Sequence, residues 1–310
     1  MPNVKTDYDI IILGGGATGL SAALYSARAM QRTLVLEKIA CGGQILITDV
    51  IENYPGFPDG VTGPDLAQLY EKQAIKAGAE VKYDMVEALH TDQTTKVVVT
   101  SEGQYTAKAI IIATGGDHNK LGIPGEETYG GKGVSYCATC DGNFFRNQPV
   151  AVVGGGDSAV QEALYLTQMT SNVTIIHRRD QLRASRILQE RAFSNSKLDF
   201  RWNTVVEQVR GNGLMESLML KDVQTDQSSS FQVPGLFIFI GFHPNTQFLR
   251  NGTMILDDGG HVVSNLRMET NVPGVFAAGD VRAFSDRQLG TAVGDGITAA
   301  LSAYHYITGE

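Results

Sequence analysis

The sequence predicts an α/β protein with two similar domains, each a sheet covered by helices. Two stretches, residues 8–30 and 148–169, each read as an apolar strand, a glycine-rich turn and a helix. Alternation of strands and helices is typical of a parallel sheet between two outer layers. At 310 residues the chain is long enough to bury two separate cores.

The first unit carries a dinucleotide-binding motif. Its apolar run, residues 8–13, leads into GGGATG at residues 14–19, and residues 20–30 follow as an Ala-rich helix. The first glycine makes the tight turn, the second lets the backbone approach a pyrophosphate, and the third lets the helix pack on the strand. The free N–H groups of the helix N-terminus then face the phosphates. The expected contacts come from Gly14, Gly16, Ala17, Thr18 and Gly19.

An acid ends the next strand of this unit. Residues 33–36 read as a strand, and Glu37 follows it at roughly the spacing from Gly19 that a dinucleotide site requires. A carboxylate there accepts hydrogen bonds from a ribose with a free 2′-hydroxyl and repels a 2′-phosphate. The alternative is a strand that ends in a solvated acid.

The following stretch contains loops, a helix and β structure. Residues 41–44 (CGGQ) and 52–57 are, taken alone, only loop signals. A helix is expected over residues 64–78, and β structure over 81–100 and 105–112. The last strand ends in ATGG at residues 113–116, a small-residue turn at which the chain could leave one domain.

The second unit repeats the first. Residues 148–153 read as a strand, GGGDSA follows at 154–159, and a helix to about residue 169 precedes a strand at 173–176. When Gly14 is set on Gly154 the two units superimpose without a gap, and Glu37 falls on His177. The repeat implies a second dinucleotide site, so that both domains are Rossmann-like. The expected contacts come from Gly154, Gly156, Asp157, Ser158 and Ala159.

The two units differ in charge at the end of this strand. Where the first has an acid, the second has His177, Arg178 and Arg179, followed by Arg183. Guanidinium groups pair bidentately with a phosphate, so we expect the second ligand to be NADPH rather than NADH. The alternative is a solvated basic surface.

The remainder returns to the first domain. Residues 198–240 read mostly as short strands with a polar turn at 224–230, and residues 241–246 as a second crossing between domains. A strand at 275–278 ends in Gly279 and Asp280, and Arg287 and Gln288 precede a helix over about 291–306. Asp280 is a candidate for binding a flavin ribityl chain.

A pair of cysteines lies between the two units. Residues 137–141 read CATCD, and Cys137 and Cys140 at this spacing can close and reopen a disulfide that stores two electrons. Asp141 is a candidate acid for the thiolate that opening releases, for which it would need a raised pKa, or alternatively a helix N-cap. Other interpretations of the pair are half a zinc site, a structural bridge or two small residues in a turn. Zinc needs four ligands, and only Cys41 and scattered histidines remain.

Composition narrows the function classes. A net charge of -8 argues against general affinity for nucleic acid or anionic membranes. The longest apolar run, around residues 236–240, has the length of a strand and not of a bilayer span. Residues 1–9 are polar, so no secretory signal is visible. A CxxC pair that cycles suits a reducing cytosol, so a cytoplasmic protein is expected.

Taken together, these motifs resemble those of the low-molecular-weight thioredoxin reductases, along essentially the whole chain. The motifs that carry the resemblance are both glycine turns, Glu37, CATCD, HRR with Arg183, GGQ at 42–44, NYPG at 53–56, ATG at 113–115, GD at 279–280 and RQ at 287–288. The resemblance implies FAD in a discontinuous domain, residues 1–117 and 244–310. It implies NADPH in an inserted domain, residues 118–243, which also carries the cysteines, and it implies a homodimer.

The resemblance also implies residue roles. Cys140 lies against the flavin, Cys137 exchanges with thioredoxin or a thioredoxin-like redoxin, and Asp141 acts as the acid. The FAD contacts that it implies, besides the first glycine turn, are Glu37, Gly42, Gln44, Asn53, Thr114, Gly115, Gly279, Asp280, Arg287 and Gln288.

The expected path of two electrons is from NADPH to the flavin, then to the disulfide and on to a protein disulfide. Cys140 and Gly154 are close in sequence and in the same domain, yet both the disulfide and the nicotinamide need the flavin face. We therefore expect the inserted domain to swing about its two crossings, near residues 115–116 and 241–244.

Two positions depart from simple expectations. Asn143 stands before Phe144 and Phe145, where the family usually has an apolar residue, and this bears on partner affinity. Cys41 is expected to be a small buried residue rather than a third redox centre. The alternative functions are an FAD-dependent oxidase or reductase of a small dithiol, and a non-catalytic nucleotide-binding or zinc-bound module; the HRR cluster disfavours an oxidase.

Overall fold

The computed structural model describes residues 6–48, 50–91, 95–249 and 252–310. The chain forms two compact units: unit 1 is Met1–Asp117 with His243–Glu310, and unit 2 is His118–Phe242. The chain passes between them through β9 (Gly116–His118) and β18 (Phe242–Pro244), which pair with each other in a two-stranded sheet.

Unit 1 is built on a mixed sheet. Its strands run in the order β5-β2-β1-β8-β7-β6, and β19 also pairs with β8. Strands β5, β2, β1, β8 and β19 are mutually parallel, whereas β6 and β7 form an antiparallel extension on the first half of β8. The strands are β1 (Tyr8–Leu13), β2 (Thr33–Glu37), β5 (Glu80–Tyr83), β6 (Val86–His90), β7 (Lys96–Thr100), β8 (Gln104–Ile112) and β19 (Val275–Ala277).

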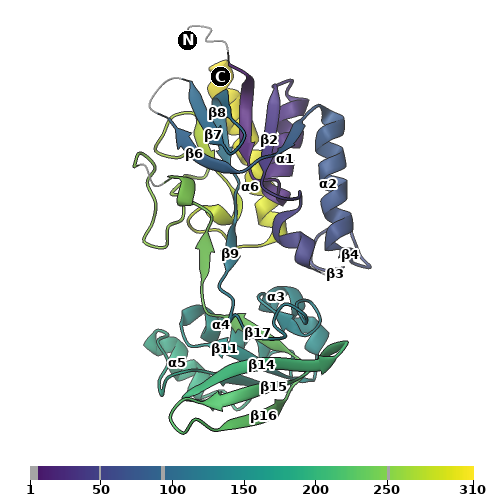
Figure 1. The fold of residues 1–310 in the computed structure, drawn as a ribbon, viewed down its shortest axis with the longest axis vertical. Helices are drawn as coiled ribbons and strands as arrows, with labels where there is room; N and C mark the ends of the chain where they lie inside the picture. The colour runs from purple at the N-terminus through teal and green to yellow at the C-terminus, as the bar shows by residue number, and fades with distance from the viewer. Residues whose placement is uncertain (1–5, 49, 92–94, 250–251) are drawn as a thin grey trace. The chain divides into compact units, whose positions relative to one another are not determined.

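Alternate residues of β1 fill two cores. Ile10 and Ile12 pack with the helices, while Ile11 and Leu13 pack on the opposite face of the sheet. This all-apolar pattern is that of a strand buried on both faces. The helices α1 (Ala17–Arg28), α2 (Gly63–Ala77) and α6 (Leu289–Thr308) lie together beside the sheet (Figure 1). The short elements are η1 (Gly43–Ile47), β3 (Val50–Ile51), β4 (Val61–Thr62), η3 (Gln247–Leu249) and η4 (Gly279–Val281).

Unit 2 repeats the parallel arrangement on a smaller scale. Its parallel strands run in the order β10-β17-β11-β12-β13, and a separate antiparallel sheet is formed by β14, β15 and β16. The parallel strands are β10 (Val134–Ser135), β11 (Pro149–Gly154), β12 (Asn172–Ile176), β13 (Leu198–Arg201) and β17 (Leu236–Phe239). The antiparallel strands are β14 (Thr204–Asn212), β15 (Leu214–Asp222) and β16 (Ser228–Gln232).

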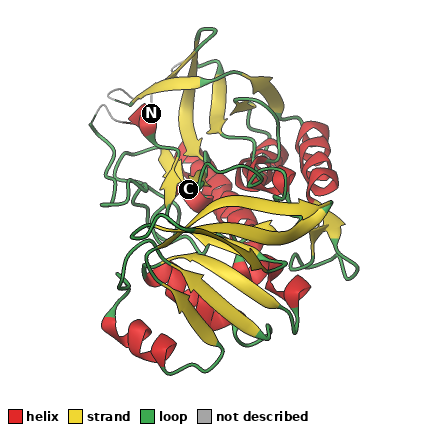
Figure 2. Ribbon diagram, turned by 60° about the horizontal axis from the view of Figure 1, so that its bottom comes forward, coloured by secondary structure: helices red, strands yellow, loops and turns green. Residues whose placement is uncertain are grey.

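Helices and the antiparallel sheet cover opposite faces of the parallel sheet in unit 2. Val150 and Val152 pack with the helices, whereas Ala151 and Val153 pack with the antiparallel strands. Figure 2 shows the strands of both sheets in yellow. The helical elements are α3 (Ala138–Asp141), η2 (Gly142–Phe145), α4 (Asp157–Leu166) and α5 (Arg186–Phe193). The predicted α/β class with two dinucleotide-binding domains is confirmed.

Local details differ from the sequence-based expectation. The polar turn expected at 224–230 is shorter, because β16 begins at Ser228. The Asp222 side chain accepts hydrogen bonds from the N–H groups of Gln224 and Thr225, which closes the turn early. Helix α5 was not expected, because its sequence is polar and only Ala192 is buried.

Candidate active site

The two cysteines of the redox turn, which we define as residues 137–141, form a disulfide in unit 2. Cys137 and Cys140 are bonded through their Sγ atoms, with their Cα atoms 5.3 Å apart. Both residues are half-buried, so the pair is within reach of solvent. The CxxC spacing predicts this disulfide.

Local contacts hold the redox turn in place. The buried Ser135 hydroxyl accepts a hydrogen bond from the Cys137 N–H at 3.0 Å, which fixes the entry to the turn. Ala138 is 1% exposed and belongs to the core under α4. At Gly142 a Cβ atom would lie 2.8 Å from Met169 Sδ, so a larger residue there would have to displace the Met169 side chain.

Cys137 is the N-cap of the short helix α3. Its Sγ accepts a hydrogen bond from the Cys140 N–H at 3.2 Å. A hydrogen bond of this kind would stabilise a thiolate at this sulfur once the disulfide opens.

Asp141 ends α3 and stands at the N-cap position of η2. Within the described part of the chain its side chain makes no capping hydrogen bond to η2. The N-cap interpretation therefore lacks the bond that would carry it, and the acid interpretation stays a prediction.

The first glycine turn is packed as the motif requires. A Cβ at Gly14 would lie 2.4 Å from the Ala113 carbonyl oxygen, and a Cβ at Gly19 would overlap the Gly14 carbonyl oxygen. At Gly16 the nearest atom to a Cβ position is 4.0 Å away, in Gly43. The first and third glycines thus allow packing, and the second leaves open space above the backbone.

Glu37 is tied to this turn. Its carboxylate accepts hydrogen bonds from the N–H of Gly15 at 2.7 Å and from the N–H of Lys38 at 2.7 Å. These bonds fix the acid directly beside the glycine turn, where the sequence predicts a ribose.

Other predicted contacts lie close to the first glycine turn. Gly42 bridges to Gly16 across the chain, and its N–H donates to the Gly15 carbonyl at 2.8 Å. A Cβ at Gly279 would meet the Thr18 hydroxyl, so the segment with Asp280 reaches the start of α1.

Three hydrogen bonds tie other predicted contacts to residues that are distant in sequence. The Gln44 amide donates to the Gly116 carbonyl at 3.0 Å, while the Thr114 hydroxyl donates to the Asn245 carbonyl at 2.8 Å. Asn53 Nδ2 donates to Gln288 Oε1 at 3.3 Å, and this bond joins the two chain segments that make up unit 1. Gly115 has a positive φ of 59° and nothing within 4 Å of a Cβ position.

Asp280 sits in a poorly solvated environment. Burial raises the pKa of its carboxyl, which the hydrogen bond from the Ser285 hydroxyl at 3.1 Å and the charge of Arg287 partly oppose. A side chain that loses water in this way favours a polar partner.

An ion pair that was not predicted from the sequence supports this segment. Arg282 Nε donates to Asp295 Oδ2 at 2.6 Å, and the same carboxylate oxygen accepts the Gly279 N–H at 3.1 Å. Asp295 is buried in α6. The only signal in the sequence was an acid within an otherwise apolar helix.

The second glycine turn has the same packing with a different neighbour. A Cβ at Gly154 would lie 2.4 Å from the Ala159 Cβ, while at Gly156 nothing lies within 4 Å. The His177 ring stands against Gly155 as Glu37 stands beside Gly15, and His177 is 5% exposed. Burial, followed by the charge of Arg183, lowers the pKa of His177, so the ring is neutral near pH 7.

The predicted arginines of unit 2 are on the surface. Arg178, Arg179 and Arg183 are exposed, and no acid among the described residues forms an ion pair with them. The backbone N–H of Arg183 donates to the Gly155 carbonyl at 2.6 Å, which anchors it at the turn. Asp157 accepts a hydrogen bond from the Ser185 N–H, while Ser158 is exposed at the start of α4.

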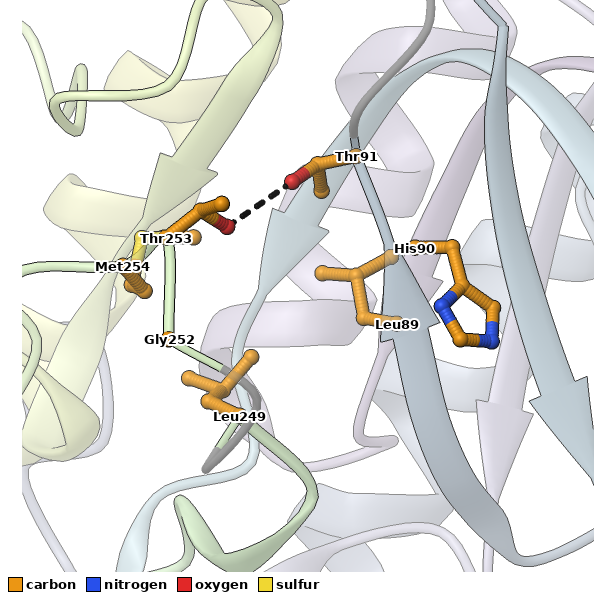
Figure 3. Close-up of a pocket in the computed structure, with 7 residues that line it drawn as sticks. All are labelled: Leu89, His90, Thr91, Leu249, Gly252, Thr253 and Met254. Atoms are coloured by element: carbon orange, nitrogen blue, oxygen red, sulfur yellow. Dashed lines mark hydrogen bonds between the residues drawn. The ribbon is translucent and has the colours of Figure 1, made fainter.

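A small pocket in unit 1 contains none of the predicted site residues. Its volume is about 170 Å3, and the Thr91 and Thr253 hydroxyls are 3.1 Å apart across its rim (Figure 3). The His90 ring points away from this pair (Figure 3). The lining residues are Leu89, His90, Thr91, Leu249, Gly252, Thr253 and Met254. None of these is a cysteine, so the pocket is not a candidate for the redox chemistry.

Membrane-spanning helices and metal clusters are absent from the part of the chain that the structure describes. No helix there has both the length and the apolar composition to cross a bilayer. No group of three or more His, Cys, Asp or Glu side chains there is arranged to hold a metal ion.

Comparison with known proteins identifies the family. A family model described as pyridine nucleotide-disulphide oxidoreductase matches residues 8–300. The chain belongs to this family. Membership implies a flavin and a pyridine nucleotide as cofactors and makes the chain a disulfide oxidoreductase.

Within the family, the chain is a member of the thioredoxin reductases. The thioredoxin reductase of Treponema pallidum (strain Nichols) is 47% identical over 304 residues, 98% of each chain. That of Bacillus subtilis (strain 168) is 47% identical over 301 residues, 97% of this chain and 95% of the other. The crystal structure of thioredoxin reductase from Streptococcus pyogenes MGAS5005 matches with a TM-score of 0.95 at 45% identity, covering 98% of this chain and 99% of that one. These matches bear out the resemblance inferred from the motifs.

The third cysteine should be inert in the folded protein. Cys41 is free, 6% exposed, and burial raises the pKa of its thiol to about 12, so the thiolate fraction at pH 8 is about one part in ten thousand. We predict that iodoacetamide at pH 8 leaves the oxidised native protein unlabelled and labels one thiol after unfolding in guanidinium. The reduced native protein should label at Cys137 and Cys140 only, as peptide mapping would show. Stoichiometric labelling of Cys41 in the folded protein would contradict its burial.

Proposed function

We propose that the chain transfers two electrons from NADPH, through FAD and the Cys137–Cys140 disulfide, to thioredoxin or a thioredoxin-like redoxin. The observation that carries the proposal is the placement of the disulfide in the same unit as a glycine turn flanked by exposed arginines. A redox disulfide and a site for a phosphorylated coenzyme are the two parts that such a reaction needs.

Unit 1 has residues that fit FAD. Gly16 leaves room for a pyrophosphate beside the N-terminus of α1, and Glu37 is fixed where a ribose hydroxyl would donate to it. The remaining contacts would come from the residues near this turn, with the half-buried Asp280 as a polar partner. When bound, the flavin accepts a hydride from the nicotinamide and supplies electrons to a disulfide.

Unit 2 has residues that fit NADPH. Gly156 leaves open space at the N-terminus of α4, and Asp157, Ser158 and Ala159 begin that helix. Arg178, Arg179 and Arg183 would pair with a 2′-phosphate. No acid in the described part of the chain forms an ion pair with these exposed arginines, so their charge is available to the phosphate. The neutral, buried ring of His177 would pack against the glycine turn and hold it in place.

The disulfide chemistry belongs to the chain's own residues. Two electrons open the Cys137–Cys140 bond, and Asp141 would give a proton to one of the two sulfurs. Cys137, whose thiolate the Cys140 N–H stabilises, would attack the disulfide of the redoxin and form a mixed disulfide. Cys140 would then attack Cys137 Sγ, which releases the reduced redoxin and restores the original bond.

Unit 2 would have to present both the disulfide and the nicotinamide to the same flavin. Cys140 and Gly154 are both in unit 2 and close in sequence, and the disulfide and the nicotinamide need the same flavin face. We propose that unit 2 turns as a rigid body about β9 and β18 between the two half-reactions.

The redoxin would meet an exposed surface next to the redox turn. Phe144 is 47% exposed, and Asn143 beside it is exposed as well. An exposed aromatic ring beside a reactive disulfide is a suitable contact for a protein substrate. We also propose a homodimer, as the family resemblance implies, and a cytoplasmic location, because a cycling CxxC pair suits a reducing compartment.

Serine substitutions separate the disulfide from the rest of the path. Cys137→Ser and Cys140→Ser should each reduce NADPH-dependent reduction of thioredoxin by more than about 100-fold, because neither variant can close the bond. Reduction of ferricyanide by NADPH should persist, since it needs no disulfide. Cys41→Ala is the control and should keep both activities. Thioredoxin reduction by a single-cysteine variant at the normal rate would disprove the proposed path.

Arginine substitutions test the choice of coenzyme. The double variant Arg178→Ala/Arg179→Ala should raise the KM for NADPH by about 10- to 100-fold, the loss expected for one or two charge-assisted hydrogen bonds, and leave the KM for NADH nearly unchanged. Arg186→Ala is a matched control, because Arg186 is also exposed and its guanidinium pairs with Glu190 instead. An equal loss for both coenzymes would mean that the two arginines support the fold.

A further inference from the structure

A buried carboxylate accepts a hydrogen bond from the residue that precedes the redox turn. Glu126 is 2% exposed, and its side chain accepts hydrogen bonds from the N–H groups of Leu121 at 2.9 Å and Gly122 at 2.7 Å. It also accepts the Tyr136 hydroxyl at 2.7 Å. Buried carboxylates need such donors, so this group is a fixed anchor for whatever donates to it.

Tyr136 joins that anchor to the place where the chain enters unit 2. Its ring stacks on the His118 ring, with centroids 5.4 Å apart and planes at 23°. The His118 ring in turn meets the Phe242 ring edge to face at 5.2 Å. His118 ends β9 and Phe242 begins β18, so the three rings tie the two crossing strands to the core of unit 2.

Tyr136 also precedes the disulfide directly. Cys137 is the next residue, and its N–H is held by the neighbouring Ser135. Burial, and then the hydrogen bond to Glu126, raise the pKa of the Tyr136 phenol. The phenol therefore stays protonated and keeps donating at any pH at which the protein works.

We propose that Tyr136 is a positioning residue, which holds the redox turn at a fixed place relative to the crossing strands through its bond to Glu126 and its stack on His118. The proposal rests on the turning of unit 2 described above. If unit 2 turns about β9 and β18, flexibility between those strands and Cys137 would misplace the disulfide relative to the flavin after each turn. A displacement of about 1 Å can lower a rate by about 100-fold, so a rigid link should have a measurable effect on the rate at which the disulfide opens.

The link from Glu126 through Tyr136 to His118 should affect the opening of the disulfide and not the reduction of the flavin by NADPH. The stack and the hydrogen bond lie between the crossings and Cys137, whereas the second glycine turn follows β11 on another part of the sheet. Loss of the phenol hydroxyl leaves Glu126 with one donor fewer and frees the ring to move within its stack. Opening of the disulfide should then slow, while reduction of the flavin by NADPH should not.

The test compares two tyrosines of unit 2 that each donate one hydrogen bond. Tyr129 packs against the same core as Tyr136, and its hydroxyl donates to the Gly211 carbonyl at 2.6 Å, away from the redox turn. NADPH is mixed anaerobically with the FAD-loaded full-length variants Tyr136→Phe and Tyr129→Phe and with the unaltered protein. Flavin bleaching is followed optically, and opened Cys137 and Cys140 are trapped with N-ethylmaleimide and counted by mass spectrometry.

The proposal predicts that Tyr136→Phe slows trapping of the two thiols at least threefold, with bleaching unchanged, and that Tyr129→Phe changes neither. His118→Leu should slow trapping as well, and His118→Phe, which keeps a ring in the stack, should restore it. Equal trapping in Tyr136→Phe and the unaltered protein, or equal slowing in both tyrosine variants, would overturn the proposal. Failure of NADPH to open the disulfide of the unaltered protein would overturn the proposed function as well.

Discussion

Both units depend on one steric constraint, the turn from a buried strand into a helix with no room for a side chain. At Gly14 the obstacle is the Ala113 carbonyl oxygen, and at Gly154 it is the Ala159 Cβ with the Phe239 carbonyl oxygen at 2.5 Å. Because the turn is tight, the helix N-terminus stands directly at the end of the strand, and its free N–H groups face outward. The second glycine of each turn, Gly16 or Gly156, then leaves open space at that point.

The same construction is used with opposite charge in the two units. In both units a residue at the end of the next strand packs against the middle of the glycine turn. Glu37, the last residue of β2, lies beside Gly15, and His177, directly after β12, lies beside Gly155. An acid at that place suits a ribose hydroxyl, and a neutral imidazole followed by arginines suits a phosphate. One repeated construction thereby supports two different ligand preferences through a few side chains at one strand end.

How much the sequence could predict depended on how local each feature is. Glycine turns, the CxxC pair and the strand-end residues are set by neighbours in sequence, and the strands and helices around them were placed within a few residues. The bond between Asn53 and Gln288, the ion pair of Arg282 with Asp295, and the hydrogen bond of Tyr136 to Glu126 depend on contacts between separate elements. No spacing rule identifies such pairs, because the pairing is decided by how the sheets are ordered. Helix α5 was missed because it is only eight residues long and half of those residues are charged or polar.

In the proposed reaction, electrons from NADPH leave the protein through the cysteine pair to a protein disulfide. The most direct measurement is anaerobic: the flavin-loaded protein is reduced with stoichiometric NADPH and mixed with oxidised thioredoxin, and the visible flavin absorbance is followed. We expect the absorbance to recover rapidly, because electrons pass through Cys137 to thioredoxin. A flavin that stays bleached in the presence of oxidised thioredoxin would contradict it and would direct the search to another redoxin or a small dithiol.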